Sequence, residues 1–102
     1  MWNIRHFSKK ENELYSRVDE VLHYIWDPIG ISDIAEARDE YHSYLPVVFG
    51  MVKRGANENE LADYLGSVTS EMMELGTNKP RDLEVAEVMV SWKEILLDTD
   101  SE

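Results

Sequence analysis

The chain has 102 residues, a length typical of one domain and too short for two independent cores. Ten basic and 21 acidic residues give a formal net charge of −11 at pH 7, which argues against binding to nucleic acid or to anionic lipid. The sequence has no cysteine, so disulfides, thiol nucleophiles and thiolate metal sites are excluded.

The N-terminal segment lacks an apolar run that could form a signal peptide or a membrane span, and a soluble cytoplasmic protein is expected. We expect a single domain over residues 1–102. Its ordered core should cover about 8–97, with a flexible C-terminal tail at 98–102.

Glycine and proline divide the chain into four parts, each with helical hydrophobic spacing. This pattern predicts an all-α fold, a small four-helix bundle, or five helices with a break at Pro46. The first helix should begin at Ser8, because Ser8 and Glu11 have capping-box spacing. It should end near Trp26, because Pro28 disfavours helical geometry at the preceding residue. Its apolar stripe consists of Leu14, Val18, Val21, Leu22 and Ile25.

The second part, residues 32–54, keeps one face apolar at Ile34, Ala37, Tyr41, Leu45, Val48 and Val52. Pro46 lacks an N–H and crowds the carbonyl of His42, which predicts a kinked helix or two helices that meet near Tyr44. Gly55 suits the left-handed position that follows a helix end.

The third helix should begin at Asn57 and stop at Gly76, with a stripe of Leu61, Leu65, Val68, Met72 and Leu75. Ala62, Gly66 and Thr69 form a second seam of small residues, along which a neighbouring helix could approach closely. The fourth helix should begin near Pro80, a residue tolerated in a first turn. It is apolar on most sides, which is typical of a central helix or of one that has a partner in another chain.

The pair Glu20 and His23 has the Glu-x-x-His spacing that metal-binding bundles use, and Asp39 with His42 is a similar pair. At about 100° per residue, Glu20 and His23 lie roughly 200° and 140° from Val18, a member of the apolar stripe. Ligands of a bundle metal site must project inward. We therefore expect no metal, no cofactor, and three ordinary surface histidines.

Enzyme signatures are weak in this sequence. It contains no Gly-x-Ser-x-Gly, no phosphate-binding glycine loop and no His-Glu-x-x-His. Abundant carboxylates do not make an acid–base pair, which requires two groups in one cleft with different environments. We expect a protein that is not an enzyme.

The negative charge is unevenly distributed. Residues 1–26 are neutral, and residues 57–75 carry five acidic side chains without a basic one. Such a surface either keeps the protein soluble or attracts a basic partner. The candidate partner-binding residues are Asp39, Glu40, Tyr44, Glu60, Asp63, Glu71 and Glu74. We expect the two segments that carry them to pack as antiparallel neighbours, with the carboxylates on one continuous side.

Three aromatic residues are further candidates, because tryptophan and tyrosine are favoured anchors at interfaces. Trp26 ends an apolar stripe and should be largely buried against the turn that follows it. Tyr41 is expected in the core, with its hydroxyl exposed. Tyr44 is equally compatible with the core and with an acidic–aromatic patch beside Asp39 and Glu40.

The run Trp26-Asp27-Pro28-Ile29-Gly30-Ile31, followed by Ala37 to Pro46 with its Asp39-Glu40-Tyr41-x-x-Tyr44 element, resembles a family of small bacterial proteins of unknown function. Gly55-Ala56-Asn57 and Ala62-Asp63-Tyr64-Leu65 also fit, so the resemblance covers roughly residues 13–97. It implies a small all-α fold and lends no catalytic residue. A looser likeness in size, charge and helix number connects the chain with acidic immunity proteins that neutralise basic toxins.

Together these observations favour a non-enzymatic interaction module, in its most concrete form an immunity or inhibitor protein that binds a basic protein. One alternative is a structural or regulatory subunit that self-associates, for example as a homodimer. Another is an enzyme or small-ligand protein, which would need a deep pocket with convergent polar groups.

Overall fold

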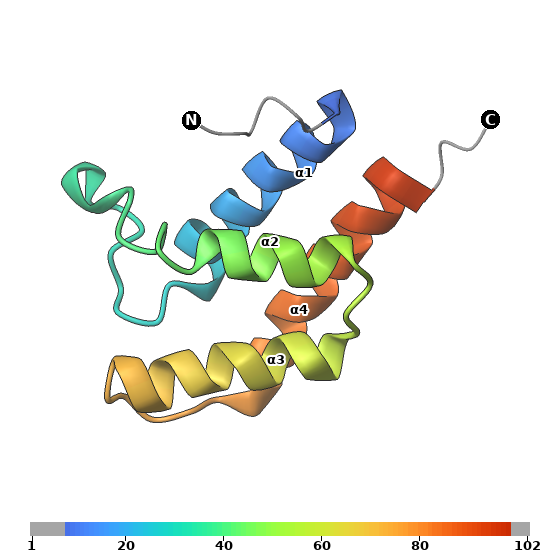
Figure 1. Ribbon diagram of the computed structural model, residues 1–102. Helices are drawn as coiled ribbons and strands as arrows, with labels where there is room; N and C mark the ends of the chain where they lie inside the picture. Colours follow the sequence, from blue (N-terminus) through green and yellow to red (C-terminus); the bar gives the residue numbers. More distant parts are fainter. Residues whose placement is uncertain (1–7, 99–102) are drawn as a thin grey trace.

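The structure is a computed structural model that describes residues 8–98, and Figure 1 shows its helices crossing one another. Their buried apolar side chains form one core. Every regular element in this range is helical, which confirms the all-α prediction. The elements are α1 (Lys9–Glu20), η2 (Val21–Trp26), η3 (Ala35–Ala37), α2 (Leu45–Lys53), α3 (Glu58–Ser67), η4 (Val68–Met72), α4 (Lys79–Lys93) and η5 (Glu94–Asp98). Residues 99–102 of the predicted tail lie outside the described residues.

Local capping signals place two helix starts where the sequence predicts them. Ser8 Oγ accepts a hydrogen bond from the Glu11 N–H at 3.0 Å, and Glu11 Oε1 accepts one from the Ser8 N–H at 3.0 Å. Asn57 and Glu60 form the same reciprocal pair, with both distances at 2.9 Å. Each box satisfies two N–H groups that would otherwise lack partners in the first turn.

The first helix ends at Trp26 as predicted, but its last turns have π-helical geometry. Asp27, the residue before Pro28, is left-handed at φ 34° and closes the helix. The wider π turn changes the direction in which side chains point, compared with the uniform α-helix assumed from sequence. Two expectations are therefore wrong: His23 is buried at 2 % exposure, and Ile25 is 37 % exposed.

The segment 32–44 is not the helix that its hydrophobic spacing suggests. It contains one turn of 3₁₀ helix, η3, and a series of backbone hydrogen bonds between residues three positions apart that continues as far as Leu45. Of its predicted stripe, Tyr41 is buried and Ile34 is 44 % exposed. A break near Tyr44 is confirmed, and Pro46 lies in the first turn of α2, where its missing N–H costs no helical hydrogen bond.

The third helical segment ends at Met72, before the predicted stop at Gly76. Glu74 adopts a positive φ of 56°, which reverses the chain and lets the Leu75 N–H donate to the Thr69 carbonyl at 2.7 Å. The end of the predicted stripe is exposed as a result, with Met72 at 62 % and Leu75 at 39 %.

The helix α4 lies at the centre of the bundle, as predicted, and contacts α1, η2, α2 and α3. Its largest interface is with α3, where Ala62 is buried, and Thr69 is buried in η4, the continuation of that helix. A Cβ on Gly66 would lie 3.6 Å from Asp82 Oδ2, so the predicted seam of small residues does face a neighbouring helix. None of the helices within 8–98 is long and apolar enough to cross a membrane.

Candidate functional site

Four predicted partner-binding residues are exposed on the third helical segment and just after its end. Glu60 and Asp63 lie on α3, Glu71 lies in η4, and Glu74 follows its end. We call these four residues the α3 acidic face. Lys79 Nζ lies 2.7 Å from Asp63 Oδ1, and within residues 8–98 this is the one ion pair that reaches the face. Both side chains of that pair are well exposed, so it neutralises little of the local field.

Four basic side chains in the rest of the described chain pair with carboxylates away from this face. Arg17 pairs with Glu13 and Glu20 on α1, at 3.2 and 3.1 Å. Arg38 makes two hydrogen bonds with the carboxylate of Asp19, at 3.0 and 3.1 Å. His42 and Lys53 also lie beside acidic side chains, those of Asp19 and Glu11. The uneven charge of the sequence therefore persists in three dimensions.

The other three predicted site residues belong to a different part of the fold. Asp39 and Glu40 are exposed in the turns that precede α2, and Figure 1 shows this segment rising from the start of α2 on the side away from α3. Tyr44 is half-buried, with its ring edge-on to Trp26 at a centroid distance of 6.5 Å. Asp39 and Glu40 are thus carried by turns, not by a helix packed antiparallel to α3.

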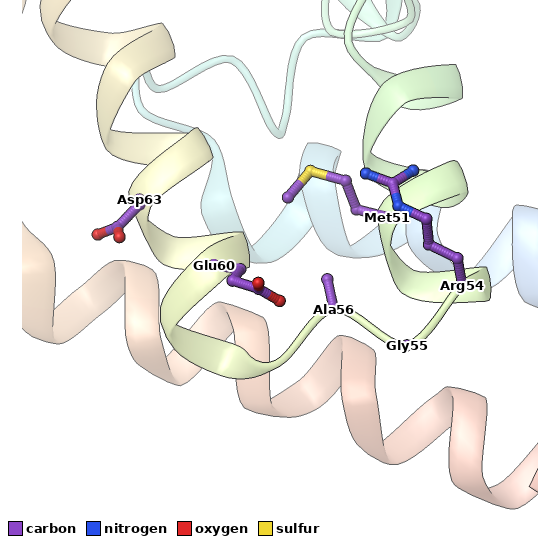
Figure 2. Close-up of a pocket in the computed structure, with 6 residues that line it drawn as sticks. All are labelled: Met51, Arg54, Gly55, Ala56, Glu60 and Asp63. Carbon is purple, nitrogen blue, oxygen red and sulfur yellow. The ribbon is translucent and has the colours of Figure 1, made fainter.

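A first pocket, of about 540 Å³, opens between the end of α2 and the start of α3. Figure 2 shows Met51 and Arg54 on the α2 side, Gly55 and Ala56 on the connecting turn, and Glu60 on the α3 side. Asp63 lines the pocket further along α3. Two members of the α3 acidic face therefore border a hollow that has a single arginine on its opposite wall.

A second pocket, of about 310 Å³, lies where η2, the chain after η4 and the start of α4 meet. Its lining includes Trp26, Pro28, Thr69, Leu75, Arg81 and Asp82. Asp82 is 4 % exposed, and its Oδ1 accepts a hydrogen bond from the Trp26 indole N–H at 3.2 Å. The sequence interpretation did not identify this pocket or its carboxylate.

Burial raises the pKa of Asp82, while the Trp26 hydrogen bond and the charges of Lys79 and Arg81 act in the opposite direction. Arg81 does not form an ion pair with this carboxylate. Its guanidinium donates to the carbonyl oxygen of Ile25 and lies 4.0 Å from Glu84. A buried carboxyl group with a raised pKa that lines a pocket is a candidate functional group, because such groups cluster at functional sites.

A signal for Asp82 is present in the sequence. It precedes Val85, Ala86 and Met89, all buried, by three, four and seven residues, and so belongs to the core face of α4. A carboxylate in that register must be either paired or placed at a pocket.

The turn after Trp26 is held by a second carboxylate. Asp27 accepts hydrogen bonds from the Ile31 N–H at 2.8 Å, the Ser32 N–H at 3.0 Å and the Tyr41 hydroxyl at 2.9 Å. The Tyr41 hydroxyl accepts one in turn from the Ile29 N–H at 3.2 Å. The hydroxyl is thus engaged inside the fold, which corrects the expectation that it would be exposed. This network shapes the loop and offers no free group to a ligand.

The candidate metal motif is not assembled. Glu20 pairs with Arg17, and the part of the chain from 8 to 98 holds no cluster of three or more metal-binding side chains. His23 is not the surface histidine expected from its helical angle. Its ring packs against Tyr24 and Tyr41, at centroid distances of 4.5 and 6.5 Å, and its Nδ1 lacks a hydrogen-bond partner among the described residues.

Comparisons with family models, with curated proteins and with solved structures find no match to this chain. The resemblance to small bacterial proteins of unknown function therefore stays an expectation from sequence.

Proposed function

We propose that this protein is a non-enzymatic interaction module whose α3 acidic face binds a basic protein, in the manner of an inhibitor or immunity protein. The supporting observation is the composition of that face: four exposed carboxylates, with a single exposed ion pair to them among residues 8–98. Opposite charge on a partner would steer the encounter and raise the association rate.

Exposed apolar side chains supply the second requirement of an interface. Met72 and Leu75 alternate with Glu71 and Glu74 at the end of the face, and both are substantially exposed. Apolar area beside charge is what a stable complex buries, whereas a surface that serves solubility alone needs only the charges.

The test begins with an affinity pull-down from the native host, analysed by mass spectrometry, to identify the partner. Association rates are then measured by stopped flow at two salt concentrations. The test variant replaces the α3 acidic face with amides: Glu60→Gln, Asp63→Asn, Glu71→Gln and Glu74→Gln. Glutamine at position 60 retains the acceptor that a capping box needs, and relief of like-charge repulsion should leave stability level or slightly raised.

A matched control carries the same change in net charge at exposed positions elsewhere: Glu36→Gln, Glu84→Gln, Glu87→Gln and Glu94→Gln. Slower association for the test variant than for the control, strongest at low salt, supports the proposal. Rates that are independent of salt and equal for both variants contradict it.

Self-association is the alternative that a specific observation favours, because Tyr24, Val47 and Ile95 are also exposed. Sedimentation over a hundredfold range of concentration separates the two functions. A mass that rises with concentration favours the self-associating subunit.

A further inference from the structure

The second pocket contains an unused acceptor. Asp82 Oδ1 is engaged by the Trp26 indole, but Oδ2 has no hydrogen-bond partner within residues 8–98. The side chain is 96 % buried, since 4 % of it is exposed, and it forms part of the pocket lining. This oxygen has no donor among the described residues and keeps some access to solvent, so a cation that donates to it forms a charge-assisted hydrogen bond at a largely buried residue.

The surroundings of Asp82 favour a donor with an apolar stem. Trp26, Pro28 and Leu75 contribute aromatic and aliphatic wall, and Thr69 contributes a hydroxyl whose proton is directed to the carbonyls of Leu65 and Gly66. The hydroxyl oxygen is thus left as an acceptor. Lysine and arginine side chains combine an apolar stem with a cationic donor, and tryptophan is the best aromatic partner for a cation.

We propose that this pocket receives the ammonium or guanidinium group of one basic side chain of the partner, with Asp82 as its counter-ion. The inference rests on the proposed function, since the basic partner supplies the side chain. At about 310 Å³ the pocket is at the lower end of small-ligand sites, which suits one inserted side chain. Glu74 immediately precedes Leu75 in the wall, so one end of the α3 acidic face adjoins the pocket lining along the chain.

Arg81 tunes this site from its rim. Its guanidinium donates to the Ile25 carbonyl and forms no ion pair with the Asp82 carboxylate, yet its positive charge opposes an entering cation. Arg81→Gln keeps a donor for that carbonyl and removes the charge. The variant should therefore bind a cation several-fold more tightly, which a merely structural role for the pocket would not produce.

The direct test uses small probes and needs no partner. Acetyl-lysine amide and acetyl-arginine amide are titrated into the ¹⁵N-labelled protein, with their uncharged counterparts acetyl-norleucine amide and acetyl-citrulline amide as controls. The readout is the Trp26 indole N–H signal, assigned with Trp26→Phe, because this group donates to the same carboxylate. We expect a saturable change in the chemical shift of this signal with at least one cation. The affinity for its neutral counterpart should be lower by at least about tenfold.

Asp82→Asn should lower the affinity for the cation about tenfold or more while keeping an acceptor for Trp26. Glu87→Gln, which changes an exposed carboxylate on the same helix, should leave that affinity unchanged. Equal shifts from charged and neutral probes, or no shift from either cation, overturn the proposal. The neutral probes keep this test valid even if the Asp82 variant does not fold.

Once the partner is known, rate measurements distinguish the proposed role of the α3 acidic face from that of the second pocket. A buried anchor acts mainly on dissociation, whereas an exposed charged face acts mainly on association. Asp82→Asn should raise koff severalfold with little change in kon, and the amide variant of the α3 acidic face should do the reverse. An unchanged koff for Asp82→Asn overturns the pocket and leaves the acidic face standing.

Discussion

The indole N–H of Trp26 donates to Asp82 Oδ1 across 56 positions of sequence, at 3.2 Å. The two residues are 4 % exposed each, so the hydrogen bond lies inside the molecule. It connects the end of the first helix with the first turn of α4, the helix at the centre of the bundle. This contact helps to fix the turn after Trp26 relative to the core, and both residues form part of the wall of the second pocket.

Replacing Trp26 should therefore be among the most damaging single changes. Trp26→Ala removes a large buried ring and should lower the free energy of unfolding by about 3–5 kcal/mol. Trp26→Phe keeps most of the ring but leaves Asp82 without its donor, and should cost about 1–3 kcal/mol. Chemical denaturation of both variants measures the two effects. An unchanged melting temperature for Trp26→Ala contradicts the prediction.

The pKa of Asp82 predicts an unusual dependence of stability on pH. Burial raises that pKa above its ordinary value of 3.8, so the folded state holds the proton more tightly than the unfolded state does. The stabilising contribution of the protonated group is complete below pH 3.8 and is lost as the pH rises through the folded pKa. The stability of Asp82→Asn relative to wild type should thus increase over that interval and become constant above it. A difference that does not vary with pH contradicts this prediction.

Asp27 should behave in the opposite way. Burial opposes its ionisation, but hydrogen bonds from Ile31, Tyr41 and Ser32 outweigh burial and lower its pKa below 3.8. Its contribution is present above pH 3.8 and is lost as the pH falls through the lower folded pKa. Tyr41→Phe removes one of those donors and the acceptor for the Ile29 N–H, and should cost about 1–3 kcal/mol at neutral pH. Denaturation of Tyr41→Phe and wild type at pH 7 and at a series of pH values below 3.8 checks this: the cost should shrink as the pH falls through the lowered pKa of Asp27 and the carboxylate takes up a proton.

His23 offers a stabilising substitution. Its Nδ1 is buried without a hydrogen-bond partner in the described part of the chain, while its ring packs on Tyr24 and Tyr41. His23→Phe retains an aromatic ring and removes the unpaired nitrogen, and should raise the free energy of unfolding by about 1 kcal/mol. His23→Ala serves as the control and should lower stability, because it leaves a cavity. A loss of stability in both variants would mean that the imidazole is needed.

Sequence pattern was sufficient wherever the deciding interaction is local. The capping boxes at Ser8 and Asn57 each join residues three positions apart, and both form as predicted. Pro28 prevents helical geometry at the residue before it, so the first helix ends at Trp26. The burial of Trp26 and Tyr41 was also predicted, since large aromatic rings on an apolar stripe gain most from leaving water.

Tertiary structure decided what depends on which elements cover one another. The π turn in η2 placed His23 inside and Ile25 outside, against a calculation that assumed one uniform helix. Residues 32–44 do not form a regular helix despite their apolar spacing. The Tyr41 hydroxyl donates a hydrogen bond to Asp27, and few of the neighbouring side chains are buried against the rest of the fold. Asp82 lines a pocket because segments distant in sequence meet there, among them Trp26, 56 residues away. A helical period describes one element in isolation, whereas burial, and with it the chemistry of a carboxylate, is set by residues that are distant in sequence.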